Sequence, residues 1–386
     1  MGGTGLKIRA ETFGGIIRLD DPPALVYVDQ EYLRGLGYPP SPLWGQPEGY
    51  LSAPTEVHLG VTAACPLGCR HCYADARPGS FPTLDTESLM RVIDLLAEMQ
   101  VFHIAFGGGE PFGRPDFLAL ARHARERDVI PNATTNGLYM TPELARECGV
   151  FGQINVSVDG VGPVYEQVRG VDGFAMADRA LGLLVEAGCS VGVNCVVSRA
   201  NFERLGELVS YVASKEVRDV LFLRLKPSGR GAMTYQAERL TPRQNRQLFP
   251  LLADLTGRHD VLLRMDCSFV PMVCWHGAEP ATMEFFDVRG CAAGESLAGI
   301  TPEGRVQACS FCGRSLGEVW RLRELWHDSP RLRDFRGWVG QAREPCRSCT
   351  YLSLCRGGCH TVAEWVEGDF WAPDPECPFV EAAGRA

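Results

Sequence analysis

The sequence has no long apolar run. No uncharged stretch reaches the roughly 20 residues of a membrane-spanning helix, and residues 1–20 lack the apolar core of a signal peptide. Basic residues are not in excess either, because 38 Lys and Arg face 47 Asp and Glu, for a net charge of −9. A general nucleic-acid surface requires a basic excess. We therefore expect a cytoplasmic protein with neither a nucleic acid nor a membrane as its partner.

The remaining composition is that of an ordinary globular chain. Its 386 residues are 45% hydrophobic and 22% charged, which is enough for one large core and a smaller satellite domain. Sixteen cysteines are present. In a reducing compartment, cysteines in this number indicate metal ligands more readily than disulfides.

Three of these cysteines lie within eight residues, in the segment Cys65-Pro66-Leu67-Gly68-Cys69-Arg70-His71-Cys72. Thiolates bind soft metals, and this tight spacing lets one loop surround a single cluster. A cubane iron–sulfur cluster has four irons, so three cysteines would leave one iron open to another ligand. The alternative is a zinc site made by the three cysteines and His71.

Strands and helices alternate on both sides of this loop. An alternating strand at 56–62 leads directly into it, and a strand at 102–106 leads into Gly107-Gly108-Gly109-Glu110-Pro111. Further strands are predicted at 129–135, 154–159, 190–197 and 220–225, and helices at 85–100, 115–127 and 175–187. This order is typical of parallel βα units, whose functional residues lie at the carboxyl ends of the strands.

Together the cysteine loop, the following Tyr73 and the Gly107–Pro111 segment resemble the radical S-adenosylmethionine (SAM) superfamily, over about residues 52–235. The resemblance implies an α/β fold, a partial (β/α)₆ TIM-like barrel. It also implies that Cys65, Cys69 and Cys72 hold a catalytic [4Fe–4S] cluster whose open iron takes SAM. SAM is then cleaved reductively to a 5′-deoxyadenosyl radical, with the electron supplied by a flavodoxin- or ferredoxin-type donor.

The same resemblance supplies candidate SAM-binding residues. Glu110 would take the ammonium group, Ser157 and Asp159 the ribose hydroxyls, and Arg169 the carboxylate, unless Arg169 is a surface arginine. Leu225 would pack on adenine, unless it is simply a core residue. The whole candidate set is Tyr73, Gly107, Gly108, Gly109, Glu110, Ser157, Asp159, Arg169 and Leu225, with Asn136 and Asn194 as weaker candidates.

A second group of cysteines near the C-terminus matches the seven-cysteine SPASM pattern, which follows radical SAM barrels in peptide-modifying enzymes. Its members are Cys291, Cys309, Cys346, Cys349, Cys355, Cys359 and Cys377. The resemblance implies two auxiliary iron–sulfur clusters, and a β-hairpin from 298–300 and 305–308. One cluster would be held by Cys346, Cys349, Cys355 and Cys377, the other by Cys291, Cys309 and Cys359. Zinc knuckles are the alternative.

Spacing alone suggests the fourth ligand of the second of these clusters. Cys312, three residues after Cys309, is the preferred candidate, and Cys274 is the next. The four remaining cysteines are expected to be small buried residues. They are Cys148, Cys189, Cys195 and Cys267.

The domain organisation follows from these assignments. We expect a β-rich element at 1–50, the barrel at 51–235, a helical bridge at 236–290 and the SPASM domain at 291–381. The first element has strand patterns at 7–10, 15–19 and 24–28 and is similar to small peptide-chaperone proteins, which bind precursor peptides at a sheet edge. It would be a truncated peptide-recognition unit or a hairpin that packs on the barrel.

Three motifs are similar to the mycofactocin maturases and, more distantly, the pyrroloquinoline quinone peptide cyclases. They are 99–103, 224–231 and 355–359. The implied function is oxidative modification of a precursor peptide, by crosslinking or decarboxylation, with a small peptide-chaperone protein as a further candidate partner. Side-chain decarboxylation of a tetrapyrrole is a second enzymatic hypothesis, and a zinc-stabilised binding scaffold is a non-catalytic one.

Overall fold

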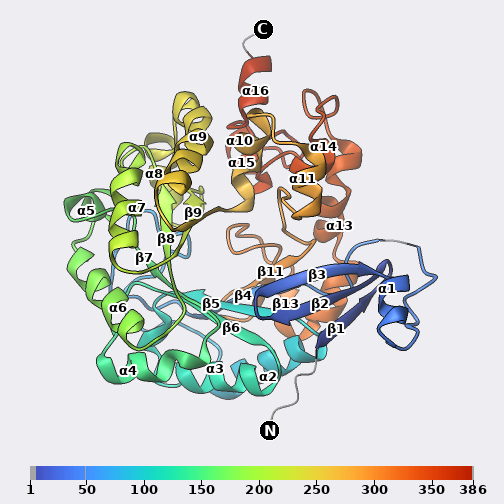
Figure 1. Ribbon diagram of the computed structural model, residues 1–386, viewed down its shortest axis with the longest axis horizontal. Coiled ribbons are helices and arrows are strands. Elements are labelled where there is room, and N and C mark those ends of the chain that lie inside the picture. Colours follow the sequence, from blue (N-terminus) through green and yellow to red (C-terminus); the bar gives the residue numbers. More distant parts are fainter. Residues whose placement is uncertain (1–5, 48, 385–386) are drawn as a thin grey trace.

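The computed structural model describes residues 6–47 and 49–384, and its central feature is one long sheet (Figure 1). The strands follow in the order β10-β9-β8-β7-β6-β5-β4-β11-β12-β13. Their bounds are β4 (Glu56–Thr62), β5 (His103–Gly108), β6 (Ile130–Thr135), β7 (Ile154–Ser157), β8 (Val191–Val197), β9 (Asp219–Arg224), β10 (Leu262–Met265), β11 (Leu297–Ile300), β12 (Arg305–Gln307) and β13 (Gly317–Glu318). From β4 to β10 every neighbouring pair is parallel, which confirms the partial βα barrel.

Helices cover the outer face of this sheet (Figure 1). They are α2 (Thr86–Glu98), α3 (Phe117–Glu126), α4 (Pro142–Glu147), α6 (Phe174–Glu186) and α7 (Leu205–Ser214). The predicted start of α2 is confirmed, because the Asp85 carboxylate accepts a hydrogen bond from the Ser88 N–H at 2.8 Å. The buried residues of α2 recur at helical spacing and pack on the sheet.

The strands divide their side chains between this outer core and the barrel interior. In β4, Val57, Leu59 and Val61 are fully buried in the core, whereas the residues between them are only half-buried. Because side chains alternate along a strand, those intervening residues face the interior. In β6, β7 and β8 the interior positions carry polar residues, including Thr134, Asn155 and Asn194. The barrel interior is therefore polar where the predicted site residues lie.

The segment from 236 to 290 contains a strand that the sequence did not suggest. Strand β10 pairs in parallel with β9, with Leu262 opposite Asp219, and so continues the barrel sheet. With four residues it is too short to show a clear alternation. Four helices lie between residues 231 and 285: α8 (Gly231–Glu238), α9 (Pro242–Arg258), α10 (Val270–Trp275) and α11 (Pro280–Phe285).

The cysteine-rich C-terminal part is joined to the barrel in two ways. The predicted hairpin is confirmed as β11 and β12, and β11 also pairs in parallel with β4. At the end of β9, the buried Arg224 guanidinium donates to both carboxylate oxygens of Asp374, at 2.6 and 2.9 Å. The helices here are α12 (Leu322–Asp328), α13 (Pro330–Gly337), α14 (Leu352–Cys355), α15 (His360–Glu367) and α16 (Pro378–Ala383). The carboxyl edge of the barrel thus faces the second cysteine group.

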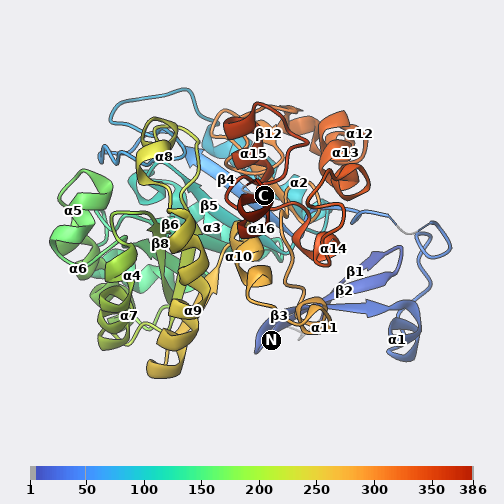
Figure 2. The same ribbon diagram turned by 90° about the horizontal axis from the view of Figure 1, so that it is seen from above.

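A separate three-stranded antiparallel sheet forms the N-terminal element. It consists of β1 (Lys7–Glu11), β2 (Gly14–Asp20) and β3 (Pro23–Asp29), followed by one helix, α1 (Gln30–Gly35). The buried Arg9 fixes it to the barrel, because its guanidinium donates to the carbonyls of Ala53 and Pro54, each at 2.8 Å. Strand β3 is an edge of this sheet (Figure 2). Most of its residues are exposed.

Within residues 6–47 and 49–384, no helix has both the length and the apolar character needed to span a membrane.

Candidate functional site

The three-cysteine loop follows β4 and is held in place by the surrounding backbone. The Cys65 N–H donates to the Arg77 carbonyl at 3.0 Å, and the Arg230 guanidinium donates to the Cys69 carbonyl at 2.9 Å. The Arg230 N–H also donates to the Cys72 carbonyl at 2.9 Å. Each of the three thiols lies within electrostatic reach of the others. The fold therefore gathers the three predicted ligands at the carboxyl edge of the barrel.

The donor set of this loop fits an iron–sulfur cluster. Burial raises the pKa of the Cys65 thiol to about 11 and also raises that of Cys69. Such thiols become thiolates only when a positive partner binds, and iron provides that charge. Cys65 already has N–H donors for an anionic sulfur, from the Leu67 backbone and from the Asn136 side chain at 3.6 Å. Asn136, a weaker candidate in the sequence, thus contacts a candidate ligand directly.

The imidazole ring of His71 pairs with a carboxylate. Its Nε2 lies 2.8 Å from the Asp159 carboxylate. Among the residues that the structure describes, no three His, Cys, Asp or Glu side chains are close enough to share a single metal ion.

The predicted glycine segment ends β5 beside the cysteine loop. Gly108 has a φ of +105°, and a Cβ at Gly109 would lie 2.0 Å from the Ala64 carbonyl oxygen. Only glycine permits this approach. The Gly108 N–H donates to the Tyr73 hydroxyl, and the Gly109 N–H donates to the Thr62 carbonyl at 2.6 Å. Gly107, Gly108 and Gly109 thus bring Glu110 next to the cysteines.

Glu110 is buried and held by hydrogen bonds from two neighbouring elements. Its carboxylate accepts from the Thr135 hydroxyl and the Asn136 N–H, each at 2.7 Å, and from the Phe112 N–H at 3.2 Å. Burial raises the pKa of the Glu110 carboxyl to about 7, against the effect of these hydrogen bonds. A cationic group placed beside it would favour the ionised form.

Asp159 and Arg169 already pair with each other. The Arg169 Nε donates to an Asp159 oxygen at 2.8 Å, and its Nη1 donates to the Tyr165 hydroxyl at 3.2 Å. Asp159 also accepts from the Val196 N–H at 2.7 Å and faces His71. Burial opposes ionisation, but Arg169 and His71 hold the pKa of Asp159 well below its usual range. Asp159 therefore orients Arg169. Because its carboxylate already has three partners, few of its lone pairs remain to accept a hydrogen bond from a ribose hydroxyl.

The barrel interior has unpaired acceptors beside this pair. The side-chain oxygens of Asn155 and Asn194 are buried, and neither has a hydrogen-bond partner within the described part of the chain. Asn155 shares the interior face of β7 with Ser157, which is opposite Asn194 on β8. A buried unpaired amide oxygen is costly unless a ligand satisfies it. These oxygens therefore fit a polar cofactor or substrate, and Asn155 was not a sequence candidate.

Leu225 lies further toward the C-terminal cysteines. It is 4% exposed and clusters with Tyr235, Cys359 and Val362. Its surroundings are those of a core residue between the two parts of the chain.

Two aromatic rings connect the cysteine loop to the C-terminal cysteines. The ring of Tyr73, next to Cys72, packs on the ring of Phe311 with centroids 4.9 Å apart. The Phe311 N–H donates to the thiol of Cys309. A direct side-chain contact therefore joins the two groups of predicted ligands.

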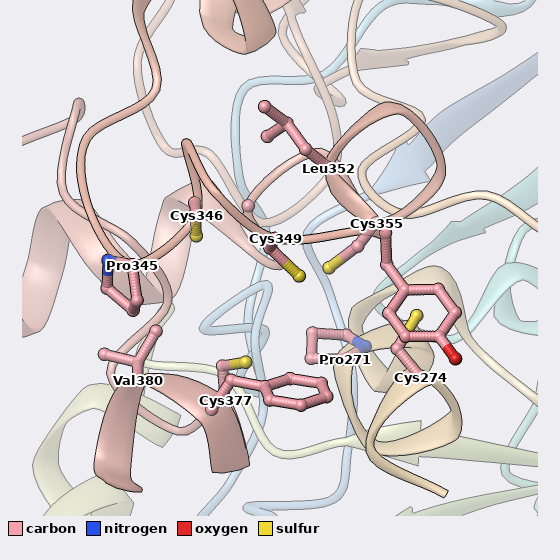
Figure 3. Close-up of a pocket in the computed structure, with 12 residues that line it drawn as sticks. Pro271, Cys274, Pro345, Cys346, Cys349, Leu352, Cys355, Cys377 and Val380 are labelled. Atoms are coloured by element: carbon pink, nitrogen blue, oxygen red, sulfur yellow. The ribbon is translucent and has the colours of Figure 1, made fainter. Parts of the chain in front are cut away.

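One auxiliary cysteine group lines a pocket between α10, α14 and α16. Its thiols point into a shared space (Figure 3), and they belong to Cys346, Cys349, Cys355 and Cys377, as predicted, with Cys274 beside them. The rest of the lining is largely apolar, including Pro271, Leu352 and Val380. Burial raises the pKa of the Cys346 thiol to about 12, so a cluster here would also supply the charge that stabilises the thiolates.

The other predicted auxiliary ligands also come together. The thiol of Cys291 interacts electrostatically with those of Cys359 and Cys309. Of the two proposed fourth ligands, Cys312 interacts electrostatically with Cys309 and accepts a hydrogen bond from the Arg331 guanidinium, whereas Cys274 is hydrogen-bonded to Cys355.

The four cysteines expected to be structural divide into two groups. Cys148 and Cys195 are buried in the barrel core, and Cys189 is half-buried against it. Cys267 lies beside Cys291 instead. Sequence spacing gave no signal for it, because it lies outside the cysteine-rich pattern.

Comparison with known families identifies this arrangement. Residues 59–212 match the radical SAM superfamily, and residues 291–350 match SPASM, an iron–sulfur cluster-binding domain. The chain is 33% identical to mycofactocin maturase MftC of Mycolicibacterium smegmatis. The aligned region spans 338 residues, which is 85% of this chain and 83% of that protein.

More distant relatives align over a similar share of the chain. PqqA peptide cyclase of Methylocella silvestris is 28% identical, over 84% of this chain and 87% of its own. Fe-coproporphyrin III synthase of Methanosarcina barkeri is also 28% identical, over 83% and 87%. The fold is similar to Streptococcus suis SuiB bound to precursor peptide SuiA, with a TM-score of 0.77 and 16% identity over 96% of this chain and 98% of SuiB.

The barrel, its three-thiol loop and the clustered C-terminal thiols define a cofactor-dependent radical enzyme. The chain belongs to the radical SAM superfamily and carries a SPASM domain. Its cofactors are SAM and iron–sulfur clusters, which decides against zinc at the cysteine groups.

Proposed function

We propose that this enzyme is a peptide maturase that oxidises a ribosomally made precursor peptide, yielding a crosslink or an oxidative decarboxylation. The observation that carries this proposal is the Tyr73–Phe311 contact, which joins the cysteine loop to the auxiliary cysteines with ring centroids 4.9 Å apart. Net oxidation of a C–H bond removes two electrons, and only one of them leaves with the abstracted hydrogen atom. The neighbouring auxiliary site is a suitable acceptor for the other electron.

The protein's own residues position the reactants. When bound, the [4Fe–4S] cluster and SAM supply one-electron cleavage of SAM and hydrogen-atom abstraction from carbon. Cys65, Cys69 and Cys72 would hold the cluster, and Glu110 would bind the SAM ammonium group. Arg169, oriented by Asp159 through its Nε, keeps its Nη2 for the SAM carboxylate. Asn155 and Asn194 offer acceptors to polar groups in the barrel.

The N-terminal sheet supplies a docking edge for the peptide. Among the residues that the structure describes, no strand pairs with the outer side of β3, and Val26 and Tyr27 on it are 37% and 40% exposed. An extended peptide can add to such an edge through main-chain hydrogen bonds. MftC and SuiB are named as a maturase and as a precursor-peptide complex, which agrees with a peptide substrate.

Val26→Asp tests this docking edge, because it places a charge on the exposed face of β3. The matched control is Leu262→Asp, which changes an exposed apolar strand residue on the edge of the other sheet. We expect weaker peptide binding for Val26→Asp only, with unchanged SAM cleavage in the absence of peptide. Equal peptide affinity in both variants would refute docking at β3.

The substrate class is tested with the reconstituted enzyme, SAM and a chemical reductant. Short peptides encoded beside this gene and an iron–tetrapyrrole are offered separately, and products are identified by mass spectrometry. We expect a peptide product lighter by 2 hydrogens or by formic acid, with a stoichiometric amount of 5′-deoxyadenosine. Decarboxylation of the tetrapyrrole with no change in any peptide would establish the alternative that the 28% identity to Fe-coproporphyrin III synthase keeps open.

The cellular setting follows from the cysteines. All sixteen are free, and thiol ligands persist in a reducing compartment. We propose the cytoplasm, a flavodoxin- or ferredoxin-type electron donor, and a small peptide-chaperone protein as a partner that complements the short N-terminal sheet.

A further inference from the structure

Cys267 is the first residue of the short 3₁₀ helix Cys267–Phe269, directly after strand β10. This position places it at the carboxyl edge of the barrel sheet, on the strand next to β9. The preceding Asp266 fixes the turn, because its carboxylate accepts from the Ser268 N–H at 3.0 Å and from the Lys226 ammonium at 2.6 Å. Cys267 therefore lies in a hydrogen-bonded turn at the barrel rim.

This rim directly borders the auxiliary cysteines. The Lys226 ammonium, bound to Asp266, lies 4.5 Å from the centroid of the Phe311 ring. Phe311 in turn donates its backbone N–H to the thiol of Cys309. On the other side, the Cys267 thiol accepts from the N–H of Ala292, the residue after Cys291. Contacts on two sides thus place Cys267 between the Cys291 and Cys309 segments.

Four thiols lie within electrostatic reach of one another at this point. Those of Cys267, Cys309 and Cys359 act on Cys291, and among them Cys267 has the largest effect. Among the thiols, Cys309 interacts most strongly with its neighbour Cys312, and it also interacts with Cys359 and Cys267. Backbone N–H groups donate to each of the four sulfurs, from Ala292, Ala293, Phe311 and Val362. Such donors stabilise thiolate ligands of iron.

We propose that Cys267 is the fourth protein ligand of the auxiliary [4Fe–4S] cluster held by Cys291, Cys309 and Cys359. The assignment depends on the chain carrying that cluster, and it does not depend on the peptide reaction. It takes one ligand from the barrel rim and three from the SPASM domain.

The candidates suggested by spacing are less well placed. Cys312 interacts with Cys309 but faces Arg331 and Glu364 on its other sides. Cys274 belongs to the pocket of the other auxiliary group, hydrogen-bonded to Cys355. Neither of them is among the groups that act most strongly on Cys291 or Cys359.

A fourth thiolate has a functional consequence. All four irons of a cubane are then bound by protein, so no iron is open to a substrate group. The cluster can exchange electrons but cannot bind the peptide directly. The Lys226 cation, close to both Cys267 and Cys359, partly offsets its negative charge.

The experiment measures open coordination in a background without the barrel cluster. The full chain carrying Cys65→Ala, Cys69→Ala and Cys72→Ala is reconstituted with iron and sulfide, reduced, and mixed with ¹³C-cyanide. Electron–nuclear double resonance then reports any cyanide bound to iron. We expect no ¹³C coupling in this parent, nor after adding Cys312→Ala or Cys274→Ala. Adding Cys267→Ala should produce a ¹³C coupling or remove about four irons per chain.

Two other cyanide-binding results would overturn the assignment. A ¹³C coupling in the parent would mean that one auxiliary iron is open, and a coupling only with Cys312→Ala would make Cys312 the ligand. If Cys267→Ala does not fold, Cys267→Ser provides an oxygen ligand of similar size. We expect it to keep its iron with shifted electron paramagnetic resonance g values. Unshifted g values would exclude Cys267. Because neither SAM nor peptide is present, failure of the proposed peptide reaction cannot be mistaken for these results.

Discussion

The two cysteine regions of this enzyme are built in opposite ways. In the barrel, three thiols come from one eight-residue loop. In the C-terminal part, Cys377 joins the thiols of a segment that begins about 30 residues earlier, and Cys291 and Cys309 lie still further back in the sequence. A three-thiol site leaves one iron open to a ligand, whereas a four-thiol site is restricted to electron transfer and structure. The construction of each site therefore indicates its role.

The two regions also differ in what holds them together without metal. Backbone hydrogen bonds from Arg77 and Arg230 fix the barrel loop. In the C-terminal part, Cys346 packs in the large hydrophobic core, Cys355 packs in a small separate cluster, and both line one pocket. A metal cluster there would join segments that pack separately, so metal binding should contribute more to folding in this region. Losing the barrel cluster should therefore change function only, whereas losing an auxiliary cluster should also disturb the fold of the C-terminal part.

Removing the barrel ligands should have the largest effect. In the variant with Cys65→Ala, Cys69→Ala and Cys72→Ala, SAM cleavage should be abolished, while iron falls by about four per chain because one cubane is lost. Iron analysis and chromatography of 5′-deoxyadenosine measure both quantities. Cys189→Ala, which changes a half-buried cysteine outside the candidate sites, should leave both unchanged. Residual 5′-deoxyadenosine formation in the triple variant would break the assignment of radical generation to the barrel.

Changing the SAM-binding candidates should have an intermediate effect. Glu110→Gln removes the charge while keeping the shape, and should weaken SAM binding by about 10- to 150-fold, the equivalent of one charge-assisted hydrogen bond. Arg169→Lys, which keeps the charge paired with Asp159, should weaken it less. Calorimetry on reconstituted protein measures the affinity, with Glu126→Gln on an exposed helix face as the control. Unchanged affinity in both variants would remove these residues from the site.

The smallest effect is a dependence of SAM affinity on pH. Burial raises the pKa of Glu110 to about 7, from 4.5 for an ordinary glutamate. Below that pH the carboxyl is protonated and cannot pair with an ammonium group, so SAM affinity should fall as the pH falls, by about tenfold from pH 8 to pH 6. The dependence should be absent in Glu110→Gln. A wild-type affinity that rises on acidification would contradict the assigned role.

Contiguous features could be predicted from the sequence. The cysteine loop, the Gly107–Glu110 segment and the C-terminal cysteine pattern each carry their geometry in local spacing. Helix α2 was predictable from its Asp85 cap and its apolar periodicity. These signals depend on neighbouring residues, and the structure retains them with small shifts at the ends of the elements.

Contacts between distant segments could not be predicted. The Asp159 carboxylate lies 2.8 Å from His71, 88 residues away in the chain, and no pattern in the sequence records this pairing. The Asn136–Cys65 contact and the approach of Cys267 to Cys291 likewise depend on how the strands align. Strand β10 was missed because four residues are too few for periodicity to be evident. The sequence indicated which chemistry is present, and the fold determined which residues meet.

The comparison between the two regions is tested most directly by separating radical generation from product formation. The variant Cys346→Ala with Cys349→Ala removes two thiols from the auxiliary pocket and leaves the barrel loop unchanged. An unchanged barrel-cluster resonance and a cooperative thermal transition show that it has folded. In single-turnover reactions with SAM and peptide, both 5′-deoxyadenosine and oxidised peptide are quantified. We predict normal 5′-deoxyadenosine with no oxidised peptide, and a full yield of oxidised peptide would contradict the assignment of electron acceptance to the auxiliary clusters.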